Sequence, residues 1–189
     1  MSSRYDLLPQ EYCEALAKLR SNVEPMSFED VLDILKEELG DIDEIFESIS
    51  PESIGSASMA QVHIAKLKNG ENVAVKVQRK NIYEKMTMDV KLLKKAISLL
   101  HLNTIIKIMD LNLVLDEIYN VAKEEMDFEL EAKHLEEFKE NNVDVAYVTV
   151  PKVYKNFVTK KALVMEYIPG VSLNEKQKLE ELGYDVEEI

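Results

Sequence analysis

The sequence predicts an α+β fold in which N-terminal helices pack on a small, mainly antiparallel sheet. The chain has 189 residues, of which 46% are hydrophobic, enough for one ordinary domain or two small ones. Glycine and proline together number only 5 + 5 = 10, which disfavours a turn-dense all-β sandwich. The spacing of apolar residues changes from a period of 3.6 to a period of 2 and back again, which indicates helices on both sides of strands.

The N-terminal part has helical periodicity. Pro9 suits the first turn of one helix. Ser27, with Asp30 three residues later, resembles a capping box that opens a second helix, and Gly40 is its expected end. A shorter helical segment follows at Ile42–Phe46. We expect these helices to form one layer, because the sequence contains no internal repeat.

A β-hairpin is predicted next. Two alternating runs, Gln61–Ala65 and Val73–Val77, flank the turn dipeptide Asn69-Gly70. The three valines of the second run share one face, whereas Ala74 and Lys76 share the other. Lys76 is therefore either a solvated strand lysine or a charge presented beside a very small side chain.

Helical spacing returns over Asn81–Leu100 and, as one longer helix, over about Leu113–Asn141. Strand-like segments follow at Tyr147–Val150, at Val153 and at Ala162–Ile168, and Pro169-Gly170 closes the last of them. Either Ser172 or Asn174 is expected to cap a final helix.

The predicted long helix carries an acidic cluster. At about 100° per residue, Glu124, Asp127 and Glu131 fall on one stripe, and Glu125 points away from it. Like charges at this spacing repel mildly. The cluster is therefore either a solvated acidic face or the neighbour of a cation, such as a lysine or a metal ion.

Charge and composition exclude several classes of protein. The net charge of 23 − 36 = −13 opposes nucleic-acid binding, and no basic stripe offsets it. The single cysteine, Cys13, can form no internal disulfide. His63, His101 and His134 lack the spacing of metal ligands, so we expect packing or surface roles and no metal site. The sequence lacks a signal peptide and a membrane-crossing apolar run, which predicts a cytoplasmic location.

Four segments occur in the order of a protein-kinase N-lobe: a loop of small residues at Ile54–Ser58, the strand with Lys76, the acidic helix, and Met165–Ile168. A small-residue loop lets backbone N–H groups approach phosphates, and Lys76 can reach phosphate oxygens as a point charge. Ala74 is slim enough to lie over an adenine. The carbonyl of Glu166 and the N–H of Ile168 would then meet the purine edge.

Three stretches, Ser53–His63, Val73–Gln78 and Glu125–Ala132, resemble the UbiB family of aarF-domain atypical kinase-like proteins. The first looks like the alanine-rich loop that replaces the glycine loop in that family. The opening Ser2–Tyr12 looks like the stretch that follows the family's Lys-x-Gly-Gln signature. The resemblance therefore spans nearly all of the chain.

The resemblance implies roles for individual residues. Lys76 would bind phosphate, Glu131 would be its ion-pair partner, and Glu125 with Asp127 would form the family's Glu-x-Asp pair, which faces the helical extension and the nucleotide pocket. The ligand would be ATP or ADP with magnesium, and the family is linked to ATP hydrolysis and to ubiquinone or other isoprenoid-lipid biosynthesis. The implied nucleotide-binding residues are Gly55, Ser56, Ala57, Ser58, Ala74, Lys76, Met165, Glu166 and Ile168.

The sequence also departs from the family. Gly55 and Ser56 stand where many members have alanine. No catalytic loop or Asp-Phe-Gly segment follows Ile168, after which 189 − 168 = 21 residues remain. We therefore expect a fragment that does not transfer phosphate alone. Its expected parts are a helical extension (1–48), a kinase-like N-lobe (49–170) and the start of a missing C-lobe (171–189).

Two functional hypotheses follow. The first is an ATP-binding N-lobe whose longer parent acts as a kinase or ATPase, with lipid-biosynthesis proteins or a membrane surface as partners. The alternative is a non-catalytic, pseudokinase-like module that binds a protein or lipid and has a vestigial pocket. Without a C-lobe, apolar surface near Ile168 and Phe128 would be uncovered, which predicts self-association. A third possibility is an unrelated acidic helical protein in which the motifs are coincidental. A structure in which Lys76 and Glu131 lie far apart would favour it.

Overall fold

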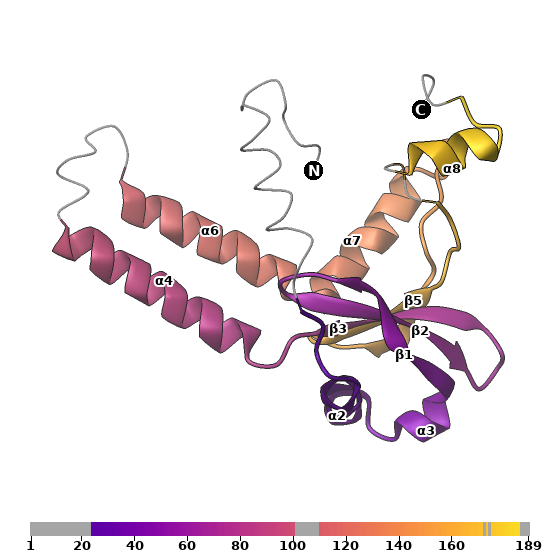
Figure 1. The fold of residues 1–189 in the computed structure, drawn as a ribbon, viewed down its shortest axis with the longest axis horizontal. Coiled ribbons are helices and arrows are strands. Elements are labelled where there is room, and N and C mark those ends of the chain that lie inside the picture. Colours follow the sequence, from indigo (N-terminus) through magenta and orange to yellow (C-terminus); the bar gives the residue numbers. More distant parts are fainter. Residues whose placement is uncertain (1–23, 101–109, 172, 174, 186–189) are drawn as a thin grey trace.

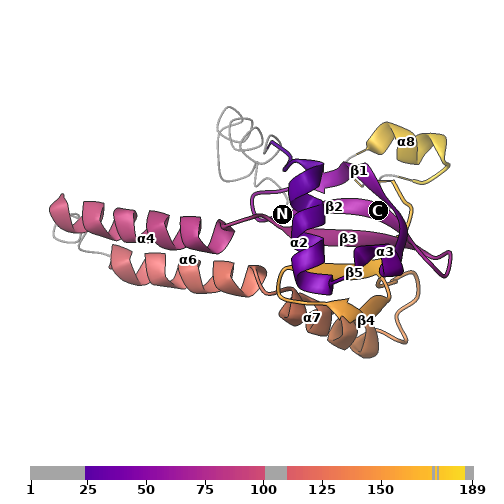
Figure 2. The ribbon, with the colours of Figure 1, turned by 90° about the horizontal axis from the view of Figure 1, so that it is seen from below.

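The computed structural model describes residues 24–100, 110–171, 173 and 175–185, and confirms the α+β class. Five strands form one sheet (Figure 1). Their order is β1-β2-β3-β5-β4, as Figure 2 shows, and every neighbouring pair is antiparallel. The strands are β1 (Phe46–Ser56), β2 (Ala60–Leu67), β3 (Asn72–Gln78), β4 (Val153–Val158) and β5 (Ala162–Glu166). The predicted β2–β3 hairpin is present, and Gly70 in its turn has a φ of 90°.

Helices α2 (Phe28–Leu39) and α3 (Ile42–Ile45) lie on one face of the sheet (Figure 2). They pack against the three β3 valines, each 0% exposed, as the alternation predicted. Ser27 is confirmed as the N-cap of α2, since its hydroxyl accepts a hydrogen bond from the Asp30 N–H at 3.2 Å and donates one to the Asp30 carboxylate at 2.8 Å. Gly40 ends α2 with a φ of 81°, which glycine adopts without strain.

Helix α7 (Phe128–Asn141) covers the opposite face, on which Ala74 and Lys76 lie. Phe128 is 1% exposed and packs with Ala60, Ala132 and Leu163. The expected uncovered surface at Phe128 is therefore wrong, because the sheet of the same chain buries this ring. Ile168 is 42% exposed, and self-association stays a prediction.

Helices α4 (Ile82–Leu99) and α6 (Leu111–Glu125) form a two-helix arm that projects from the sheet (Figures 1 and 2). Lys94 and Asp116 form an ion pair across the arm. The hydroxyls of Thr87 and Tyr119 are 2.7 Å apart. In the described part of the chain, no helix combines the length and the apolar character needed to cross a membrane.

The single long helix predicted over Leu113–Asn141 is wrong. The chain breaks at Met126-Asp127, where Asp127 is extended (φ −103°, ψ 97°) and caps α7 by accepting hydrogen bonds from two backbone N–H groups, those of Glu129 and Leu130. An aspartate stabilises a helix more at its N-terminus than in its interior, because its carboxylate satisfies backbone donors that have no partner within the helix.

The strand predictions also need correction. Tyr147–Val150 is not a strand, and Tyr147 is fully exposed with a φ of 68°. Residues 54–56 are the end of β1 and not part of a loop. Helix α8 (Lys176–Glu181) confirms a final helix, although Glu175 occupies its N-cap. Several other predictions concern residues that the structure does not describe. They are the helix after Pro9, the stretch Ser2–Tyr12, Cys13, His101, Ser172 and Asn174.

Candidate functional site

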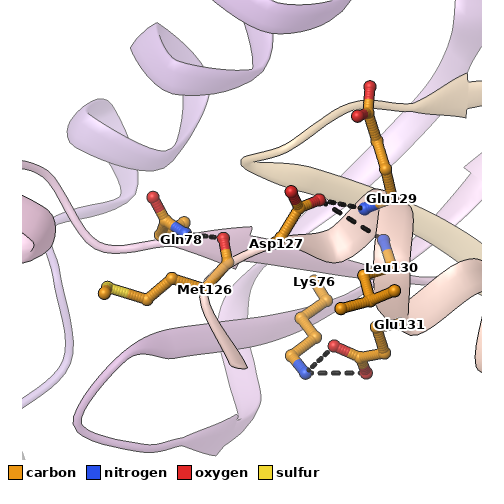
Figure 3. A network of polar contacts seen from close by, with 7 residues as sticks. All are labelled: Lys76, Gln78, Met126, Asp127, Glu129, Leu130 and Glu131. Atoms are coloured by element: carbon orange, nitrogen blue, oxygen red, sulfur yellow. Dashed lines mark hydrogen bonds and ion pairs between the residues drawn. The ribbon is translucent and has the colours of Figure 1, made fainter. Parts of the chain in front are cut away.

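An ion pair between β3 and α7 is the centre of the candidate site. The Lys76 Nζ lies 2.8 Å from Oε1 and 2.6 Å from Oε2 of Glu131, a residue 55 positions later in the chain (Figure 3). The two side chains are 24% and 33% exposed. The predicted contact is therefore present, and the cation that the acidic cluster called for is a lysine of the same chain.

The ring of Phe128 also fixes the Lys76 ammonium. The Nζ lies 4.8 Å from the ring centroid, within the range of a cation–π interaction. Because the ring is buried under α7, it offers the lysine a rigid platform. The carboxylate and the ring together hold one positive charge at the surface of the sheet.

The break between α6 and α7 shapes the acidic cluster. Gln78, which is 7% exposed, donates a hydrogen bond from Nε2 to the Met126 carbonyl oxygen at 2.6 Å (Figure 3). Asp127 caps α7, and its Oδ2 lies 3.9 Å from the Lys160 Nζ. Glu125 is the last residue of α6. The two residues of the Glu-x-Asp pair therefore lie on opposite sides of the break: Glu125 ends α6, and Asp127 caps α7.

A pocket of about 460 Å³ lies beside the ion pair. Glu125, expected to point away from the stripe of Glu124, Asp127 and Glu131, lines it with Glu124 and Glu131, whereas Asp127 does not. That expectation is wrong because it assumes one helix, which the structure divides into α6 and α7. The lining holds one lysine and three carboxylates, a local charge of 1 − 3 = −2 when all are ionised. It consists of Lys76, Val121, Glu124, Glu125, Leu130, Glu131, His134, Leu135 and Phe138.

These carboxylates do not form a metal site by themselves. Among the described residues, no group of three or more His, Cys, Asp or Glu side chains is arranged to hold a metal ion. The helix break and the ion pair thus create an acidic pocket whose described side chains are not arranged as a set of metal ligands.

The predicted phosphate loop is a tight turn between β1 and β2. Gly55 pairs with Val62, Ser56 pairs with Gln61, and the Ala57 N–H donates a hydrogen bond to the Ala60 carbonyl at 2.8 Å. Only residues 57–59 are left between the strands, and Ser58 is the middle one. None of these residues belongs to the lining of the 460 Å³ pocket.

Arg79 ties this turn to the segment before α2. Its Nε donates to the Ala57 carbonyl at 2.8 Å. Its Nη2 lies 2.8 Å from the Ser56 hydroxyl oxygen and 3.0 Å from the Glu24 carbonyl oxygen. The guanidinium therefore holds the turn and the segment before α2 together.

The remaining predicted residues lie along β3 and β5. Ala74 is opposite Met165 in the antiparallel register, on the same face as Lys76, and is 6% exposed. Glu166 is tied to Lys152, because its N–H donates to the Lys152 carbonyl at 2.8 Å and its carboxylate accepts from the Lys152 N–H at 3.1 Å. The lining of the 460 Å³ pocket does not include Ala74, Met165, Glu166 or Ile168.

Sequence reasoning gave no role to Gln78 or Arg79, expected Phe128 only as part of an uncovered apolar surface, and read His134 as a packing or surface residue. One available signal was the spacing of Gln78, which lies two residues after Lys76 and so on the same face of the strand. The Arg79 contacts had no local signal, since they join residues 22, 23 and 55 positions away. His63 does pack inside, where its Nε2 is 2.9 Å from Gln61 Nε2 and its Nδ1 is 2.8 Å from the Ser50 carbonyl oxygen.

Known proteins are similar to this chain in sequence. The chain is 38% identical over 190 residues to an uncharacterised protein of the hydrogenase 1 5′ region of Clostridium pasteurianum, covering 100% of this chain and 36% of that protein. It is 37% identical to the chloroplastic protein ACTIVITY OF BC1 COMPLEX KINASE 8 of Arabidopsis thaliana, covering 97% and 25%. The chain thus spans about a quarter to a third of the length of these relatives.

A solved structure shows the same fold. The Rv3197–erythromycin complex from Mycobacterium tuberculosis matches with a TM-score of 0.67 and 30% identity, over 90% of this chain and 43% of that one. The sequence profile of the ABC1 atypical kinase-like domain matches residues 18–189. The chain therefore belongs to the ABC1 atypical kinase-like family.

Proposed function

We propose that this chain binds ATP or ADP as a magnesium complex and forms the nucleotide-binding N-lobe of an ABC1 kinase-like protein. The observation that carries the proposal is the Lys76–Glu131 pair, with Nζ–oxygen distances of 2.6 and 2.8 Å beside a 460 Å³ pocket. A lysine held by a helix glutamate is the arrangement with which kinase folds fix the phosphates of a nucleotide.

The charge of the pocket supports a magnesium complex over free nucleotide. Three carboxylates against one ammonium repel a bare polyphosphate. Magnesium neutralises part of the phosphate charge and accepts carboxylate oxygens as ligands. Glu125 and Glu124 are the pocket carboxylates outside the ion pair that would face the metal, and Lys76 would donate to phosphate oxygens.

The other predicted residues complete the proposed site. Gly55 and Ser56 at the end of β1, with Ala57 and Ser58 in the turn, would lie against the phosphates. Ala74 and Met165 would pack under the adenine, and the Glu166 carbonyl and Ile168 N–H would contact its edge. Since the Ala57 N–H already bonds to the Ala60 carbonyl, its contact with a phosphate requires the turn to open. Lys76 is therefore proposed as the principal phosphate contact.

We further propose that the whole protein serves ubiquinone or other isoprenoid-lipid biosynthesis, with lipid-biosynthesis proteins or a membrane surface as partners. Family membership supports this proposal, and the kinase or ATPase activity of the whole protein is proposed on the same basis. Nucleotide binding by this chain is the part that can be tested directly.

The test is thermal unfolding of the 189-residue chain with and without Mg-ATP or Mg-ADP. Nucleotide at about 100 times its dissociation constant is expected to stabilise the folded chain by about 2.7 kcal/mol. Lys76→Ala should lose this protection. Omission of magnesium should weaken it strongly, because the acidic pocket then faces an unneutralised polyphosphate.

Lys66→Ala is the matched control. Lys66 lies on the neighbouring strand β2 and has its own ion pair, with Glu47 at 2.8 Å, so the same chemical change is made away from the pocket. Protection should persist in this variant. Absence of protection in the unmodified chain would contradict the proposal and favour the non-catalytic interaction module.

A further inference from the structure

Strand β3 holds helix α7 at two points. Lys76 and Gln78 lie two residues apart and therefore on the same face of the strand. Lys76 binds Glu131 in the first turn of α7, and Gln78 binds the Met126 carbonyl just before that turn (Figure 3). The ion pair is the proposed phosphate contact, whereas the amide contact has no assigned role.

The Gln78 contact is buried on both sides. Gln78 is 7% exposed and Met126 is 6% exposed, and the Nε2–O distance is 2.6 Å. Met126 is the C-cap residue of α6, where backbone carbonyls lack partners within the helix. A buried carbonyl without a donor is unfavourable, so Gln78 stabilises the chain break at this residue.

The position of the break determines where the acidic side chains go. Asp127 follows directly and caps α7, and Glu131 lies one turn further along the helix. Glu125 precedes the break and lines the pocket. If the sequence slid by one residue through α7, Glu131 would rotate by about 100° around the helix axis, and its carboxylate would move away from Lys76.

We propose that Gln78 is a positioning residue: it fixes the start of α7 so that Glu131 meets Lys76 and Glu125 faces the pocket. The inference deepens the proposed function and rests on it for its biological meaning, since Lys76 is the proposed phosphate contact. The geometric part can be tested without nucleotide.

The experiment measures how fast an amine-reactive ester modifies Lys76, by peptide mass spectrometry on the full chain without nucleotide. Lys76 is 24% exposed, and exposed Lys85 provides an internal reference. Glu131→Gln defines the rate for a lysine without its carboxylate partner. Gln78→Met, which keeps the length and removes the amide donor, is expected to raise the rate several-fold toward that limit.

Gln61→Met is a closely matched control. Gln61 is the same residue type on the neighbouring strand, 1% exposed, and its amide bonds to the Met26 N–H at 2.7 Å on the α2 face of the sheet. The Gln61→Met substitution also removes a buried amide contact, but this contact does not involve α7. In Gln61→Met, the ester should modify Lys76 at the same rate as in the unmodified chain, even if the melting temperature of the variant falls.

An unchanged Lys76 rate in folded Gln78→Met would overturn the proposal, as would an equal rise in Gln61→Met. If Gln78→Met does not fold, Gln78→Asn is tested in the same way, because its shorter amide cannot reach the Met126 carbonyl. Failure of both variants to fold while Gln61→Met folds would show a structural role and also overturn it. Nucleotide binding can fail in the unmodified chain without changing any of these outcomes, so the two proposals are tested separately.

Discussion

Asp127 shows how one residue can be read in two ways. Within an uninterrupted helix it would repel Glu124 and Glu131 on the same stripe. In the structure Asp127 lies between α6 and α7 and is not inside a helix. Its carboxylate accepts two backbone hydrogen bonds, at 3.1 Å from the Glu129 N–H and 3.3 Å from the Leu130 N–H. Asp127 therefore stabilises the helix that carries the lysine's partner.

The cap makes a prediction about stability. Asp127→Ala should lower the free energy of unfolding by about 1 kcal/mol, because two N-terminal donors of α7 lose their acceptor. Asp127→Asn keeps an oxygen at the same place and should retain most of that stability. Urea unfolding of both variants is the measurement, and equal losses in the two would indicate that charge, not capping, is responsible.

At the scale of elements, α2 is fastened to the sheet by Lys80, which follows β3. Its Nζ lies 2.7 Å from Asp30 and 3.2 Å from Asp33, both on α2. The hydrogen bond from Lys80, and then the one from Ser27, lowers the pKa of the Asp30 carboxyl below its ordinary value of 3.8. The pKa of Lys80 is raised above 10.5, first by its bond to Asp30.

These shifts predict how stability depends on pH. Because the pKa of Asp30 is lowered in the folded state, its contribution is present above about pH 3.8 and is lost as the pH falls through the folded-state pKa. The urea midpoint of the unmodified chain should therefore exceed that of Asp30→Asn at neutral pH, and the gap should shrink as the pH falls below 3.8. Glu29→Gln, on the same turn, is the control. A gap that does not depend on pH would contradict the prediction.

Elements with strong local signals could be predicted from the sequence. Helix α2 has a capping box, an apolar stripe and a terminal glycine, and the β2–β3 hairpin has alternation around Asn69-Gly70. Strand β1 was missed because it is an edge strand with register shifts and contains Pro51, so its exposure does not alternate regularly. The α6–α7 break was missed because helical periodicity continues through it.

The candidate site divides in the same way. Lys76 and Glu131 could be paired because β-strand alternation and a family motif both marked them. The Gln78 and Arg79 contacts depend on tertiary structure, since each joins segments at least 22 residues apart. No local pattern encodes such a contact, so these residues became visible only in the folded chain.

At the scale of the whole molecule, burial is unevenly distributed. The sheet lies between two hydrophobic clusters, one under α2 and α3 and one under α7, and most of β3 is buried. In the arm, the buried residues are Ile97 of α4 and Ala122 of α6. Apolar side chains such as Leu99, 76% exposed, lie on its surface. The arm therefore has little core of its own.

This asymmetry predicts that the arm opens without the sheet. Amides of α4 and α6 should exchange with deuterium at least tenfold faster than those of β3, an opening free energy lower by about 1.4 kcal/mol. Asp116→Asn removes the ion pair with Lys94 and should speed exchange in the arm while leaving β3 unchanged. Equal protection of arm and sheet, or a variant that accelerates both together, would show that the molecule opens as one cooperative unit. Mass spectrometry of peptides from the two regions distinguishes these outcomes within a single experiment.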